Sequence, residues 1–165
     1  MPRAVTGRIR PIDGSVIPVT TISTLSVDCG GGGIKASVLD AEGAIVSRAV
    51  RTPTPYPLPP TKLVETIAGL AEQLPRADRV TVGMPGMIRH GVVIATPHYI
   101  TRDGPRSRVL PELVERWDHF DMGRAIAAAL GLPTKVLNDA EVAGAGAVTG
   151  RGLEMIITLG TGLGN

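Results

Sequence analysis

Two short stretches of the sequence carry residues suited to binding anions and activating hydroxyl groups. Asp28 ends an apolar run and precedes four consecutive glycines, Gly30 to Gly33. Successive bare amides in a turn can form a concave anion site, and a neighbouring carboxylate suits a hydrated Mg²⁺. Asn138 and Asp139 end another apolar run, and a carboxylate within reach of a hydroxyl can accept its proton. A purely structural interpretation of Asp139, as a helix cap, stands beside this one.

The residues after the four glycines predict a turn between antiparallel strands. Residues 34–38 read Ile-Lys-Ala-Ser-Val, a mostly β-forming alternation, whereas the glycines of a dinucleotide-binding loop open a helix. The Gly-Lys-Ser/Thr ending of a Walker loop is also missing after these glycines. Taken alone, the stretch fits a glycine-rich hairpin without a ligand as well as a phosphate site.

The same design recurs at the end of the sequence. The apolar residues 154–159 run into a second glycine-rich loop, made of Gly160, Thr161, Gly162 and Gly164. Two strand–glycine hairpins, with Asn138-Asp139 between them, suggest two similar domains that hold one phosphate chain from both sides.

The hydrophobic pattern places these stretches in an α/β fold. It predicts strands, the first three as a meander, at 22–28, 34–40, 44–50, 79–84, 92–94, 134–137 and 154–159. It predicts helices from Thr61 to Leu74, at 124–130 and at 140–148. The polar, arginine-rich residues 101–118 are interpreted as a solvated loop. The predicted domains are a flexible extension at 1–22, a first domain at 23–150 and the start of a second at 151–165.

Composition excludes several classes of protein. Hydrophobic residues make up 43% of 165 residues, which indicates a globular protein, and only four residues are aromatic. We therefore expect an aliphatic core and no stacking surface for single-stranded nucleic acid. The single cysteine, Cys29, excludes an internal disulfide and a cysteine-rich zinc site, and it fits a cytoplasmic location. No apolar run reaches the length of a membrane span.

Taken together, the motifs resemble those of the ROK sugar kinases (repressor, open reading frame, kinase), and most closely the polyphosphate glucokinases. These kinases belong to the sugar kinase/actin/heat-shock-70 ATPase superfamily. The resemblance covers residues 22–165 and rests on the stretches 28–35, 51–55, 83–93, 137–140 and 159–164. It implies a ribonuclease-H-like domain with a mixed sheet and flanking helices, plus the first strand and loop of a second similar domain.

The resemblance also implies a reaction. A phosphoryl group passes from polyphosphate or ATP to the 6-hydroxyl of glucose or a similar hexose, with Asp139 as general base. Asp28 would hold Mg²⁺ through water. The implied sugar-binding residues are Pro85, Gly86, His98 and Asn138. The implied phosphate-binding residues are Gly30, Gly31, Gly32, Gly33, Lys35, Gly160, Thr161, Gly162 and Gly164. Expected partners are the hexose, the donor and a second copy of the chain, without DNA or a membrane.

Three departures from the family pattern accompany this expectation. Gly32 stands where the family has Ser or Thr, and His98 stands near the place of an Asn in the sugar pocket. The family's later sugar-binding Glu and His, and its zinc-binding cysteines, would lie beyond Asn165. A truncated or degenerate kinase that binds sugar or phosphate weakly is therefore an alternative. A second alternative, a ROK transcriptional regulator, needs a helix-turn-helix that residues 1–21 are too short to supply. Lys35 also fits a simple solvated lysine.

Overall fold

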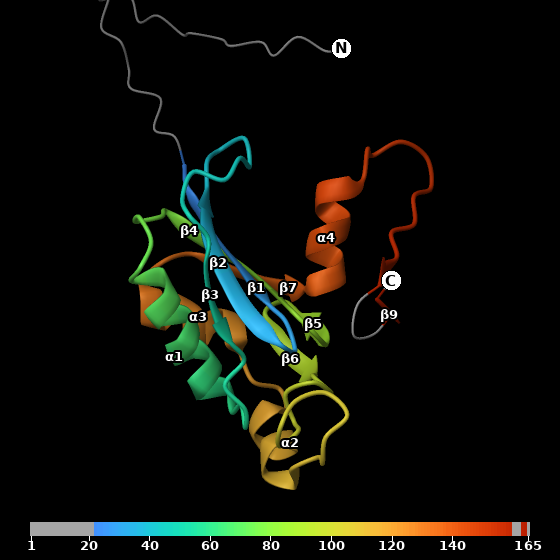
Figure 1. Cartoon of the computed structure of the whole chain (residues 1–165). Coiled ribbons are helices and arrows are strands. Elements are labelled where there is room, and N and C mark those ends of the chain that lie inside the picture. The colour runs from blue at the N-terminus through green and yellow to red at the C-terminus, as the bar shows by residue number, and fades with distance from the viewer. Residues whose placement is uncertain (1–21, 160–162, 165) are drawn as a thin grey trace, which may run out of the picture.

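The structure is a computed structural model that describes residues 22–159 and 163–164. Its centre is a five-stranded mixed sheet with the strand order β3-β2-β1-β4-β7 (Figure 1). Three strands form the predicted antiparallel meander: β1 (Thr24–Cys29), β2 (Gly33–Leu39) and β3 (Val50–Pro53). β4 (Arg79–Met84) and β7 (Thr134–Asn138) run parallel to β1. The predicted α/β class and mixed sheet are confirmed.

Helices cover the two faces of this sheet unequally. α1 (Pro60–Ala71) and α3 (Met122–Leu130) lie on one face, and α4 (Asp139–Ala147) lies on the other (Figure 1). α1 and α3 meet the sheet through buried apolar side chains at helical spacing: Leu63, Ile67, Leu70, Met122 and Ile126. Alternate residues of β1 point to opposite faces, so Val27 and Cys29 are buried while Asp28 is exposed. The face that carries α4 is therefore the one on which polar side chains of β1 remain accessible.

Two smaller elements follow β4. β5 (Met87–Arg89) and β6 (Val92–Ala95) form an antiparallel hairpin, with His90 at a positive φ of 52° in its turn. α2 (Pro111–Trp117) lies inside the stretch that was predicted to be a solvated loop, so this part of the prediction was wrong. Its Leu113 and Trp117 are buried one turn apart, and the charged residues between them obscured that short apolar face.

Two predicted strands differ from the sequence pattern, one in position and one in length: the third strand of the meander lies at Val50–Pro53 and not at 44–50. The strand predicted at 44–50 is mostly a loop, because Asp40 accepts hydrogen bonds from the amides of Glu42 and Ala44 and turns the chain there. The strand predicted at 154–159 is reduced to β8 (Thr158–Leu159), which pairs with β9 (Leu163–Gly164). The predicted extension at 1–22 lies, except for its last residue, outside the described residues.

Aromatic residues contribute more to the core than their number suggested. The chain's four aromatic side chains form one stack in the order Tyr56, Tyr99, Trp117 and Phe120, with neighbouring ring centroids 5.6–6.5 Å apart. Tyr99 and Trp117 are almost completely buried. The expected aliphatic core is therefore correct for the sheet but incomplete, because this aromatic stack fills the end of the molecule near α2.

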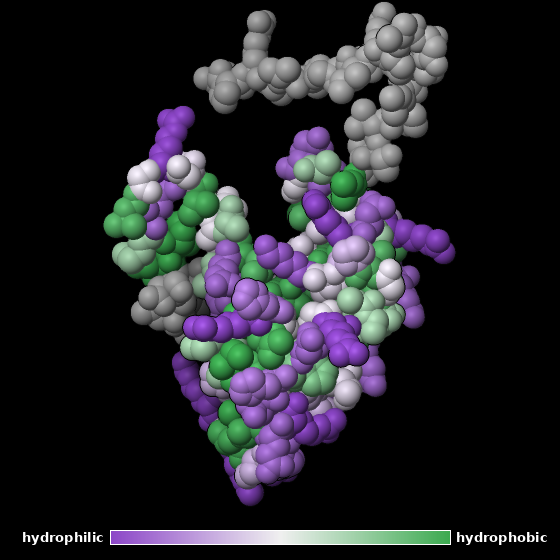
Figure 2. Space-filling view, turned by 180° about the vertical axis from the view of Figure 1, so that it is seen from behind, coloured by the Kyte–Doolittle hydropathy of each residue, from purple (hydrophilic) through white to green (hydrophobic). Residues whose placement is uncertain are grey.

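α4 and the residues that follow it form a lobe beside the sheet. Seen from behind, a hollow separates this lobe from the rest of the molecule, and apolar atoms gather on it (Figure 2). Its exposed apolar side chains are Val148, Leu153, Met155 and Ile157. Among the described residues, no helix is long and apolar enough to cross a membrane.

Candidate functional site

The predicted site residues gather where the parallel strands end. Asp28 of β1 lies opposite Gly83 of β4, and Met84 of β4 lies opposite Asn138 of β7. The carboxyl ends of parallel strands meet at one edge of a sheet, which is where open α/β sheets bind ligands. With neighbouring strands about 4.8 Å apart, Asp28 and the end of β7 are separated by roughly 10 Å. The topology therefore brings together residues that are far apart in the sequence.

The four glycines form the turn between β1 and β2, as predicted, and Gly30 to Gly33 are called the glycine turn below. The amide of Gly30 donates to the carbonyl of Gly33 at 2.9 Å and closes the turn. None of the four has a positive φ, so glycine is required at Gly30, Gly31 and Gly33 by the close approach of other atoms rather than by unusual torsion angles. A Cβ on Gly31 would lie 2.7 Å from the Pro105 side chain, whereas a Cβ on Gly32 would meet nothing within 4 Å.

Asn138 links two parts of the site. Its side-chain oxygen accepts hydrogen bonds from the backbone amides of Ala140 and Glu141 and so caps α4. In return, the backbone amide of Asn138 donates to the Glu141 carboxylate. Its side-chain nitrogen donates to the carbonyl of Gly86 at 2.7 Å. Within the described residues, the second N–H of this side-chain amide makes no hydrogen bond, so it could donate to a ligand. The Pro85–Gly86 turn after β4 is thereby fixed against the start of α4.

Asp139 is the first residue of α4 and is exposed. The cap of this helix is Asn138, so the capping interpretation of Asp139 is wrong. In the described part of the chain, one Asp139 oxygen accepts a hydrogen bond from the Ala140 amide at 2.9 Å, and the carboxylate makes no other hydrogen bond or ion pair. The second oxygen is therefore free to accept a proton from a bound hydroxyl.

Asp28 and Lys35 form a directly opposed pair on β1 and β2, beside the glycine turn. Both side chains are exposed, and both point to the face of the sheet that carries α4. Mg²⁺ in phosphate sites takes one or two carboxylates and completes its shell with water and phosphate oxygens. Among the described residues, no three acidic, histidine or cysteine side chains gather as a metal cage. A single accessible carboxylate beside bare amides fits the Mg²⁺ arrangement.

His98 lies against the glycine turn. Its Cδ2 would be 3.6 Å from a Cβ on Gly31, and its Nδ1 is enclosed without a hydrogen-bond partner in the described structure. A sugar contact by His98 would therefore come from Nε2.

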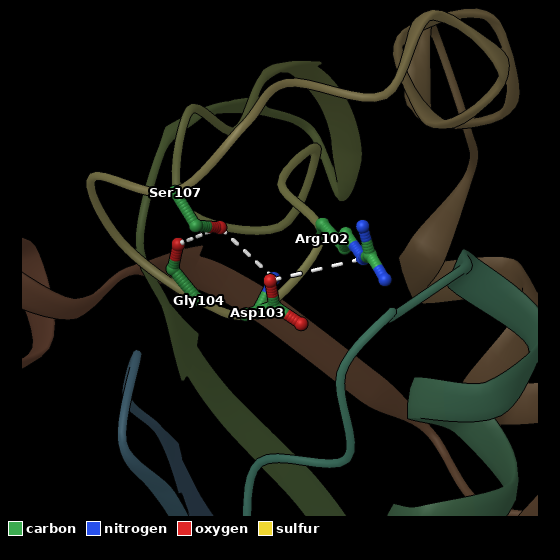
Figure 3. Close-up of polar contacts among 4 residues, drawn as sticks. All are labelled: Arg102, Asp103, Gly104 and Ser107. Carbon is green, nitrogen blue, oxygen red and sulfur yellow. Dashed lines mark hydrogen bonds and ion pairs between the residues drawn. The ribbon is translucent and has the colours of Figure 1, made fainter.

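Residues 101–109, called the arginine hairpin below, carry Pro105 onto the glycine turn. The hairpin is ordered from within, because the Ser107 hydroxyl donates to the Gly104 carbonyl and accepts from the Asp103 amide (Figure 3). Arg102 lies 3.8 Å from the Asp103 carboxylate, and both side chains are largely exposed (Figure 3). Arg106 and Arg108 are exposed as well. Three cationic side chains thus lie on a loop that contacts the turn predicted to bind phosphate.

The sequence motifs do not include three hydroxyl groups that hold this site together. Tyr99 donates to the carbonyl of Cys29 at 2.9 Å, and Thr54 donates to the carbonyl of Gly30 at 2.8 Å. Thr96 donates to the carbonyl of Pro85 at 2.9 Å. The only signal for Thr54 and Thr96 was a threonine beside a proline in each predicted loop, which is common outside functional sites.

Not every predicted residue or cavity belongs to this arrangement. Gly160, Thr161 and Gly162 lie outside the described residues, and Gly164 is seen as part of β9. A groove of about 720 Å³ runs beside the sheet-edge strand β7, between α3 and the β5–β6 hairpin. None of the predicted site residues in the described part of the chain lines that groove.

Solved structures of sugar kinases share this fold and part of this sequence. The inorganic polyphosphate/ATP-glucomannokinase from Arthrobacter sp. strain KM matches with a TM-score of 0.69 and 30% identity, over 87% of this chain and 56% of that one. A ROK family glucokinase from Streptomyces griseus, in complex with glucose and AMPPNP, matches with a TM-score of 0.55 and 27% identity. That match covers 74% of this chain and 35% of the glucokinase.

A curated sugar kinase and a family model also match this chain. The N-acetylmannosamine kinase of Escherichia coli (strain SE11) is 32% identical over 149 residues, which cover 87% of this chain and 46% of the relative. The chain thus spans about half the length of the curated relatives that it matches. The ROK family model matches residues 24–165. The expected resemblance is confirmed, and the chain belongs to the ROK family.

Proposed function

We propose that the protein is a hexose kinase of ROK type, which transfers a phosphoryl group from polyphosphate or ATP to the 6-hydroxyl of glucose or a similar sugar. One observation carries the proposal: Asp139, the residue directly after β7, lies at the same sheet edge as Asp28 and the glycine turn at the end of β1. A proton acceptor and a phosphate-binding turn at one edge are what phosphoryl transfer to a hydroxyl requires. The named activities of the relatives support the same class of reaction.

In this proposal each group has a defined role. Asp139 accepts the proton of the 6-hydroxyl while that oxygen forms its bond to the transferred phosphorus. The bond from phosphorus to the bridging oxygen of the donor breaks, and the donor remainder stays on the amides of the glycine turn. Asn138 and the Pro85–Gly86 turn orient the sugar. Asp28 would hold Mg²⁺, which neutralises charge on the donor phosphates when bound.

The test is phosphorylation by the full-length gene product. Glucose, mannose and N-acetylmannosamine are each offered with long-chain polyphosphate and with ATP, in the presence of Mg²⁺. We expect phosphate transfer to at least one hexose, with loss of activity when Mg²⁺ is chelated. Failure with every sugar and both donors would refute the proposal. The cytoplasmic location and a homodimer remain predictions, which localisation in cells and light scattering would check.

A further inference from the structure

Tyr99 is completely buried, and its hydroxyl holds the backbone at the entrance to the glycine turn. The hydroxyl donates to the carbonyl of Cys29, which lies between Asp28 and Gly30. Burial raises the pKa of the Tyr99 hydroxyl well above its usual value, and the nearby groups of Cys29, Tyr56, Asp139 and Asp28 raise it further. The hydroxyl therefore keeps its proton, and remains a donor, throughout the physiological pH range.

The glycine turn has no side chains with which to fix its own shape. Two carbonyls at the start of the turn are instead held from outside: the Cys29 carbonyl by Tyr99 and the Gly30 carbonyl by Thr54. A carbonyl shares a rigid plane with the next amide, so the two bonds also set the directions of the Gly30 and Gly31 N–H groups. The Gly30 N–H closes the turn onto Gly33. Two hydroxyls from outside the turn thus help to set the orientation of these two amides, of which the Gly30 amide is already bonded within the turn.

The aromatic stack keeps the Tyr99 ring in place. The ring lies between Tyr56 and Trp117, with centroids 6.5 Å and 5.6 Å away. Trp117 is itself fixed, because its ring N–H donates to the Leu58 carbonyl at 2.8 Å. A ring held on both sides cannot swing its hydroxyl away from Cys29 without disturbing α2 and the proline-rich residues 55–59 before α1.

Tyr99 also belongs to the loop that bears the candidate sugar contact. His98 precedes it, and Thr96 ties the start of the same loop to the Pro85 carbonyl. We propose that Tyr99 is a positioning residue for the phosphoryl donor, acting through the Cys29 carbonyl and joining the sugar-side loop to the glycine turn. This inference rests on the proposed kinase function, because it assigns the glycine turn to the donor.

The test compares Tyr99→Phe with two other variants in the full-length gene product. Tyr99→Phe removes only the hydroxyl, so the KM for the donor should rise about 5–10-fold, as expected for one lost buried hydrogen bond, while the KM for the sugar changes less than about twofold. Thr54→Val removes the hydrogen bond to the Gly30 carbonyl and should also raise the KM for the donor. Thr66→Val is the matched control, because it removes a hydroxyl that donates to the Lys62 carbonyl within α1 and belongs to neither the aromatic stack nor the glycine turn. It should leave the donor KM unchanged.

Amide hydrogen exchange gives a second readout that does not depend on activity. In Tyr99→Phe, the amide of Gly30, which closes the glycine turn, should exchange about 5–10-fold faster than in the wild type, and those of β4 should not. An unchanged donor KM in an active Tyr99→Phe enzyme would overturn the inference, and so would an equal rise in Thr66→Val. If the wild type phosphorylates no sugar, the proposed function fails, and unchanged exchange at the glycine turn would then overturn the positioning role separately.

Discussion

The side-chain nitrogen of Asn138 lies 2.7 Å from the carbonyl oxygen of Gly86 and donates a hydrogen bond to it. This bond ties the end of β7 to the turn after β4, while the other end of the same amide caps α4. The position of Asp139 is set by Asn138, because Asp139 is the residue that follows the cap. The geometry of the candidate base therefore depends on a bond between two neighbouring strand ends.

Asn138→Asp should separate these two roles. Aspartate still caps α4, since its carboxylate accepts the same amides, but it cannot donate to Gly86 and places a charge beside that carbonyl. We expect the free energy of unfolding to fall by about 1–2 kcal/mol in urea denaturation at neutral pH. Glu141→Gln is the control, because glutamine preserves the capping box and should be nearly neutral. Equal stability of Asn138→Asp and wild type would show that the bond to Gly86 contributes little.

Neighbouring positions of the glycine turn should respond differently to a side chain. Gly31→Val should damage donor use, because its Cβ would collide with Pro105 and push the arginine hairpin off the turn. Gly32→Ser should fold normally, because nothing lies within 4 Å of its Cβ. It would also supply the hydroxyl that the family pattern has at this position, so we expect an equal or lower KM for the donor. If Gly32→Ser raised the donor KM more than Gly31→Val did, the donor would not bind at this turn.

The arginine hairpin should distinguish the two candidate donors. Arg102, Arg106 and Arg108 are exposed on a loop that contacts the glycine turn, and a long polyanion can reach more of them than ATP can. The variant in which all three are glutamine should therefore lose more kcat/KM with long-chain polyphosphate than with ATP. Its remaining polyphosphate activity should also depend less on salt, because surface attraction is screened. Equal losses with both donors would place the polyphosphate chain elsewhere.

The elements that carry the site were largely predictable from local sequence. The alternation of apolar and polar residues after the glycines identified β2. The apolar run before Asn138 identified β7. Motif order then implied that the strand ends meet, because the carboxyl ends of parallel strands share one edge of the sheet.

The parts that escaped prediction depend on contacts between residues far apart in the sequence. Nothing in the residues near Tyr99 indicates that its hydroxyl reaches Cys29, 70 positions earlier. α2 was missed because its apolar face consists of only two buried side chains within a charged segment. The capping alternative for Asp139 stayed open because Asn138 and Asp139 are both good caps, and only the end of β7 decides between them.

Cys29 should be unreactive in the folded protein. It is fully buried, and burial, reinforced by the Asp28 charge, raises the pKa of its thiol far above the usual value. The folded state therefore favours the neutral thiol, and this contribution to stability is complete below the thiol's unfolded pKa. It is lost as pH rises above about 8.5, where the unfolded thiol ionises. Alkylation by iodoacetamide at pH 8 should occur only when urea unfolds the chain, and rapid labelling of the native protein would contradict this burial.

Asp139→Asn tests the general base. Asparagine has the same shape but cannot accept a proton at neutral pH, so turnover should fall by about 10²–10⁴-fold while sugar affinity measured by titration is nearly unchanged. Because Asn138 is the cap, the variant loses only a favourable charge at the start of α4, about 0.3–1 kcal/mol. Asp121→Asn is the matched control, since Asp121 caps α3 and should tolerate the same change without loss of turnover. Near-normal turnover in Asp139→Asn of the full-length gene product would show that another group removes the proton.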